Sequence, residues 1–101
     1  MAYEGGALDA TIAAAADGDG ALFLELRGAF LDSAARQLDL LRRSRCDGNW
    51  RMAAMRLKGL ASSFHAETLL ALAEEAVDAV PSEPTVLRRL QRHLDELALS
   101  I

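Results

Sequence analysis

Residues 49–64 read Asn-Trp-Arg-Met-Ala-Ala-Met-Arg-Leu-Lys-Gly-Leu-Ala-Ser-Ser-Phe, and this stretch decides the fold expected for the chain. Its apolar residues recur every three or four positions, the spacing that places side chains on one face of an α-helix. Asn49 is the predicted N-cap, because its side chain can accept a hydrogen bond from the first turn. The predicted buried stripe consists of Trp50, Ala54, Leu57, Ala61 and Phe64.

The rest of the chain shows the same helical spacing between clusters of Gly, Asp and Pro. The last helix is expected to be capped by Ser82, with Pro84 in its first turn, where a missing N–H is harmless. Short connections between long amphipathic helices favour antiparallel neighbours. We therefore predict an all-α fold, an antiparallel up-down four-helix bundle with a short additional N-terminal helix at about 7–16. The four bundle helices are expected at about 20–45, 49–64, 66–79 and 82–99.

The predicted core depends on Ala and Leu, because aromatic residues make up only 5% of the chain. Such a composition favours packed helices over sheet. Outside residues 49–64, the predicted stripes consist of Leu8 and Ile12, then Phe23, Leu26, Phe30, Ala34, Leu38 and Leu41, then Leu69, Leu72, Ala73, Ala76 and Val80, and finally Leu87, Leu90, Leu94, Leu97 and Ile101.

The length of 101 residues predicts a single domain, residues 1–101, without internal repeats or linkers. A net charge of −4 argues against a nucleic-acid surface, and the basic run 42–45 complements the dipole at the end of a long helix. The single cysteine, Cys46, excludes an internal disulfide and suits a reducing compartment. No apolar run approaches the roughly 20 residues of a membrane span, and no signal peptide is evident. We expect a cytoplasmic protein that does not bind membranes.

The face of residues 49–64 opposite the buried stripe is unusually apolar. Gly59 within this helix costs about 0.5–1 kcal/mol relative to alanine, which suggests that another group approaches the backbone there. Close packing within the chain, or an incidental glycine beside stray exposed methionines, is the alternative interpretation. Lys58 is the only lysine among eleven basic residues. The face consists of Met52, Met55, Gly59, Ser62 and Ser63, with Arg56 and Lys58 at its margins.

Residues 54–59 read Ala-Met-Arg-Leu-Lys-Gly, which resembles the His-x-Leu-Lys-Gly signature of histidine phosphotransfer (HPt) domains, with Met55 in the place of the phosphorylated histidine. Residues 26–31 resemble the long helix that precedes the site in this family, and Asn49-Trp50 resembles the start of its active-site helix. The resemblance extends over about residues 22–79. The chain is identified as a degenerate member of the HPt family.

The resemblance implies a function in phosphorelay signalling. HPt domains carry a phosphoryl group between receiver-domain aspartates on a histidine nitrogen, and a methionine thioether cannot accept it. In the family the lysine lies near the phosphoryl group and the glycine leaves room for the receiver's loops, so Lys58 and Gly59 are expected to have these positions. A second departure is His65, where the family has a glycine in a turn, and histidine tolerates the left-handed conformation better than most residues.

We therefore predict a pseudo-HPt protein of a two-component system that is not an enzyme and needs no cofactor. It would bind a response-regulator receiver domain, or a histidine-kinase element, without accepting phosphate. We expect a monomer in which Met55 is substantially exposed. The predicted partner-binding residues are Met52, Met55, Arg56, Lys58, Gly59 and Ser62.

Two other functions remain open. The chain could be an active phosphotransfer protein that uses His65, although His65 lies roughly 15 Å along the helix from Met55. It could also be a structural bundle that dimerises through the methionine face. Metal binding is not expected, because Cys46, His65 and His93 lack ligand spacing, and His93 is interpreted as a surface or interface residue. Haem binding is not expected either, since Met55 and His65 do not face each other.

Overall fold

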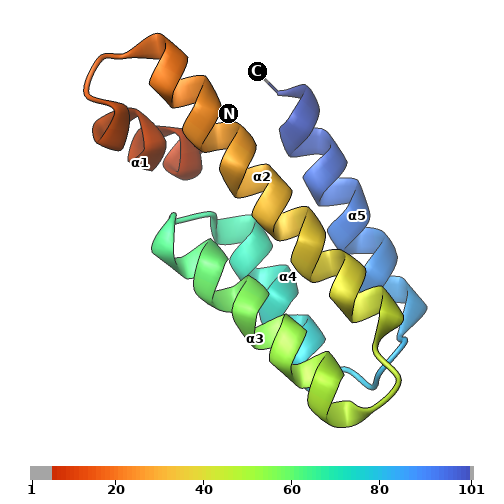
Figure 1. The fold of residues 1–101 in the computed structure, drawn as a ribbon. Helices are drawn as coiled ribbons and strands as arrows, with labels where there is room; N and C mark the ends of the chain where they lie inside the picture. The colour runs from red at the N-terminus through yellow and green to blue at the C-terminus, as the bar shows by residue number, and fades with distance from the viewer. Residues whose placement is uncertain (1–5, 101) are drawn as a thin grey trace.

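Helices formed by amphipathic segments account for nearly all of the chain. The computed structural model describes residues 6–100, and within this range it contains five helices and no strand. The prediction of an all-helical fold is confirmed (Figure 1). The helices are α1 (Gly6–Ala16), α2 (Gly20–Arg43), α3 (Asp47–Ser63), α4 (Glu67–Asp78) and α5 (Pro84–Leu99).

Each of the four longer helices, α2 to α5, packs against two of the others. Helix α2 contacts α3 and α5, and helix α4 contacts the same two helices (Figure 1). Helix α1 packs against α2, beside its N-terminal part (Figure 1). The molecule is elongated, with principal extents of 43 × 25 × 19 Å. Helix α3, which carries the candidate site, is therefore held between α2 and α4.

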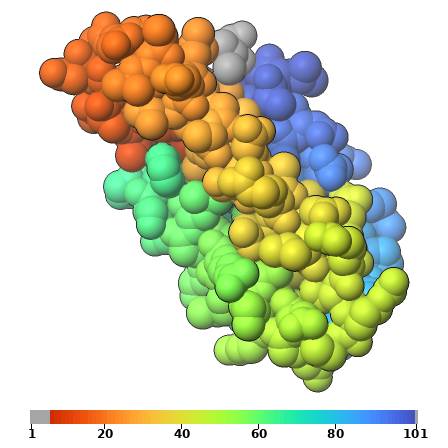
Figure 2. Space-filling view, viewed as in Figure 1, coloured from red at the N-terminus to blue at the C-terminus, as the bar shows by residue number. Residues whose placement is uncertain are grey.

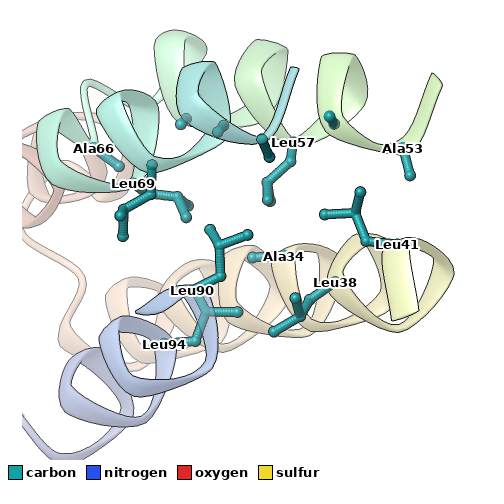
Figure 3. Packing of buried hydrophobic residues seen from close by; sticks show 14 of the residues in the cluster. Ala34, Leu38, Leu41, Ala53, Leu57, Ala66, Leu69, Leu90 and Leu94 are labelled. Atoms are coloured by element: carbon teal, nitrogen blue, oxygen red, sulfur yellow. The ribbon is translucent and has the colours of Figure 1, made fainter. Parts of the chain in front are cut away.

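The core lies where leucine and alanine side chains from facing helices meet. Leu41 of α2 and Leu57 of α3 point into the space between these helices, and Leu69 and Leu90 face each other between α4 and α5 (Figure 3). Trp50 is 1% exposed, and its indole Nε1 donates a hydrogen bond to a backbone carbonyl of α4 at 2.7 Å. This bond satisfies the one polar atom of the largest buried side chain and ties α3 to α4.

Several positions differ from the predicted stripes. Val80 follows α4 and is 68% exposed, because the helix ends at Asp78 and the chain turns away from the core. Ile101 lies outside the described residues. Four residues of the predicted stripes are only half-buried and lie at the edges of the core: Phe23, Leu26, Phe64 and Leu87.

The helix caps predicted from the sequence are wrong in two places. Asn49 lies inside α3, which begins at Asp47 with Cys46 as a cap that makes no side-chain hydrogen bond. Ser82 has a φ of 68°, outside the extended region that an N-cap requires. Glu83 caps α5 instead, by accepting a hydrogen bond from the backbone N–H of Thr85 at 2.9 Å. The predicted position of Pro84 in the first turn is confirmed.

A buried arginine connects three helices. Arg27 of α2 is fully buried, and its Nε lies 2.7 Å from Oδ1 of Asp9 on α1. Its Nη2 donates to the hydroxyl of Ser100, just after α5, at 2.9 Å. Among residues 6–100 its Nη1 has no hydrogen-bond partner. These contacts hold α1 against the end of the molecule at which α2 begins and α5 ends.

No helix within residues 6–100 combines the length and the apolar character needed to cross a membrane.

Candidate functional site

The outer face of α3 exposes two methionines. Met52 and Met55 are 52% and 45% exposed, whereas Leu57 and Ala61 on the inner face are fully buried. The prediction that Met55 is substantially exposed is confirmed. Thioether side chains in water gain free energy when a partner buries them, and their flexibility lets them fit varied surfaces.

Gly59 lies on the same face, and the structure shows no internal reason for it. A Cβ atom added at this position would meet nothing within 4 Å. Close packing within residues 6–100 is thus not the cause of this glycine. The other described glycines are equally open, so an approaching partner backbone and an incidental glycine both remain as explanations.

The polar residues of the predicted site surround this face. Arg56 and Ser62 are exposed. Lys58 is half-buried at the margin toward α4, with its Nζ 3.8 Å from Oε2 of Glu74. Such a long pair between partly exposed groups contributes little stability, so the ammonium group can move to another acceptor. All six predicted residues lie on α3, five exposed and Lys58 at the edge.

His65 and His93 lie away from the methionine face in different surroundings. His65, in the turn between α3 and α4, has a φ of 58°, the left-handed conformation expected for that turn. Its Nδ1 lies 3.1 Å from the hydroxyl of Thr11 on α1. His93 is 4% exposed, so the prediction of a surface or interface residue is wrong. Its position three residues after Leu90 places it on the buried face of α5.

A groove extends the site from α3 onto α2. It encloses about 340 Å³ between the end of α2 and the start of α3. Leu40, which is 38% exposed, belongs to its wall on α2. Sequence reasoning missed this residue, because it assigned Leu38 and Leu41 to the core without asking what Leu40 would contact. The groove is lined by Leu40, Arg43, Ser44, Asn49, Met52, Ala53 and Arg56.

The arrangement can bind by apolar contact and positive charge, and its thioethers offer no nitrogen or carboxylate for phosphoryl transfer. Cys46 is exposed with a free thiol. Within residues 6–100, no three His, Cys, Asp or Glu side chains form a group that could hold a metal ion. No family model, curated protein or solved structure matches the chain.

Proposed function

We propose that the chain is a pseudo-HPt protein that docks a response-regulator receiver domain, or a histidine-kinase element, without accepting phosphate. In this proposal α2 to α5 are the antiparallel up-down bundle of an HPt domain, and the protein acts as a cytoplasmic monomer. Its effect would be to sequester a response regulator or to compete with an active phosphotransfer protein.

The observation that carries the proposal is the exposure of Met52 and Met55 on the face of α3 that also holds Gly59. Met55 occupies the position of the phosphorylated histidine in the resemblance, and it points to solvent as that histidine must. Affinity at a protein interface comes mainly from a few well-buried side chains, so docking does not require the nucleophile. Methionine at this position replaces a polar ring with an apolar chain of adaptable shape.

The test is a titration of receiver domains encoded in the same genome against the wild-type chain and Gly59→Arg. Gly59→Arg adds a long side chain to the methionine face at a position where a Cβ meets no atom within 4 Å, so it should fold normally and abolish binding. Ala98→Arg, at an exposed position of α5, is the matched control and should bind as the wild type does. If no receiver binds the wild type, or if Gly59→Arg binds equally well, the proposal is wrong.

The same samples test the absence of phosphotransfer. After incubation with a phosphorylated receiver, the wild type should carry no acid-labile phosphate. Labelled wild type together with unlabelled His65→Ala would establish His65 as a phosphorylation site and contradict the proposal. Sedimentation of the wild type and Met52→Lys tests dimerisation, because a dimer that Met52→Lys dissociates would assign the methionine face to self-association.

A further inference from the structure

Positive charge is concentrated in one part of this acidic chain. Residues 36–58 hold seven of the eleven basic residues and two of the fifteen acidic residues. The remainder holds four basic and thirteen acidic residues. The segment comprises the second half of α2, the connection to α3 and most of α3, and Figure 2 shows these parts side by side on one face. The methionine face and the groove therefore lie in the basic part of the molecule.

The helix dipole explains only part of this charge. Arg42 and Arg43 occupy the last turn of α2, where positive charge is favourable. Helix α3 has no basic residue in its last turn, so the dipole gives no reason for Arg56. Internal ion pairs do not explain it either, since no salt bridge to Arg56 is present among residues 6–100. The pair of Arg43 with Asp39, at 3.0 Å, joins side chains that are 68% and 60% exposed. An exposed pair of this kind exchanges readily for a better-placed partner.

We infer that the groove between α2 and α3 receives carboxylate side chains of an acidic protein surface, with Arg43 and Arg56 as the recognising groups. This inference rests on the proposed docking role of Met52 and Met55 and names the chemistry of the partner. The groove brings both guanidinium-bearing residues next to Leu40 and Met52. A guanidinium group presents several N–H donors in a plane and binds carboxylates well. The partner's apolar side chains cover the thioethers while its carboxylates enter the groove.

Salt screens charges that lie more than a Debye length apart, so a bound partner responds mainly to the charges closest to it. The Debye length is about 8 Å at physiological ionic strength, well below the 43 Å length of the molecule. A partner at the junction of α2 and α3 therefore responds to the nearby arginines more than to the net charge of −4. An acidic partner is repelled elsewhere on the chain, so the charge distribution also orients the encounter.

The exposed apolar side chains favour a protein over a nucleic acid. Phosphate backbones are bound by basic and polar groups, and they bury little apolar surface. Leu40, Met52 and Met55 lie among the basic residues and are each more than a third exposed. A protein partner buries these side chains and neutralises the arginines in one interface, which combines an apolar centre with a charged rim.

The test compares Arg43→Gln/Arg56→Gln with Arg88→Gln/Arg92→Gln, which removes the same charge from exposed positions of α5. The first ligand is any receiver domain that binds the wild type. Arg43→Gln/Arg56→Gln should weaken binding about tenfold, because it removes two exposed ion pairs with the partner. The control variant should bind as the wild type does. At about 1 M salt, where the Debye length is about 3 Å, the difference should vanish.

A second ligand separates this inference from the proposed function. It is a short synthetic peptide of Asp, Glu, Leu and Phe, titrated into the chain with isotope-labelled methionine methyl groups. The Met52 and Met55 signals should shift, and the shifts should disappear in Arg43→Gln/Arg56→Gln. If no receiver binds but the peptide behaves in this way, the groove inference stands and the proposed function fails.

Three results would overturn the inference. The first is a receiver that binds Arg43→Gln/Arg56→Gln as tightly as the wild type, which leaves the proposed function intact. The second is the absence of any peptide-induced shift when no receiver binds. The third is a DNA duplex that shifts the same methyl signals with the same dependence on Arg43 and Arg56, which would assign the groove to phosphates.

Discussion

Asp9→Ala should destabilise the protein more than any other change to an acidic side chain of α1 or α2. The substitution leaves the guanidinium of Arg27, which is fully buried, with the Ser100 hydroxyl as its described partner. Removing one member of a buried ion pair typically costs about 3–5 kcal/mol. The Asp9 side chain is 18% exposed, so water can partly replace it, and we expect the free energy of unfolding to fall by about 3 kcal/mol. The free energy of unfolding of a native protein is about 5–15 kcal/mol, so this loss would remove a large share of the total stability.

Arg27→Met should cost less than Asp9→Ala, about 1 kcal/mol, because it removes the buried charge instead of isolating it. The partly exposed Asp9 carboxylate can then turn toward water. In the double variant Asp9→Ala/Arg27→Met, the loss should be close to that of Arg27→Met alone, which gives a coupling energy of about 3 kcal/mol in magnitude.

Urea unfolding followed by tryptophan fluorescence measures all three variants, because Trp50 is the single tryptophan and is buried. Thermal unfolding of Asp9→Ala should show a midpoint lower by about 12–24 °C. Asp32→Ala, at an exposed position of α2, is the control and should stay within about 0.5 kcal/mol of the wild type. If Asp9→Ala also stays within that range, or if Arg27→Met is the more damaging change, the assigned role of the ion pair is wrong.

Three further substitutions test α3. Trp50→Phe should lower the free energy of unfolding by about 2 kcal/mol, because it removes the hydrogen bond to the Ala76 carbonyl and part of a buried ring. Urea unfolding followed by circular dichroism measures the loss, and a value below about 0.5 kcal/mol would contradict the packing described for Trp50. Gly59→Ala should raise the free energy of unfolding by about 0.5–1 kcal/mol, since the added methyl group meets no atom, and a decrease would show that the position is strained. Met55→His should leave stability within about 0.5 kcal/mol, because the side chain is exposed, and should gain acid-labile phosphate from a phosphorylated receiver; an unlabelled, folded variant would refute the register of the resemblance.

The composition and periodicity were sufficient to predict five helices and most of the core. Helical spacing is a local property, so the stripe of Trp50, Ala54, Leu57 and Ala61 could be recognised without any tertiary information. The exposure of Met52 and Met55 follows from the same periodicity, because a residue opposite a buried stripe faces solvent. Helix ends were less accurate, since Ser82 has a positive φ that no local pattern indicated.

Contacts between segments that are distant in the sequence could not be predicted from helical periodicity. Arg27 was not predicted to be buried, because a charged side chain enters a core only where distant groups such as Asp9 and Ser100 compensate it. His93 was placed on the surface for the same reason, as its burial depends on the packing of α5.

The sequence by itself determined that the chain is helical and that the face of α3 opposite its buried stripe carries Met52 and Met55. Only the tertiary structure decided that Gly59 has open space around it and that Leu40 and Arg43 of α2 adjoin Met52 and Arg56. The physical reason is that periodicity specifies which face of a helix is exposed, whereas the surface that this face shares with a neighbouring helix depends on how the two helices pack.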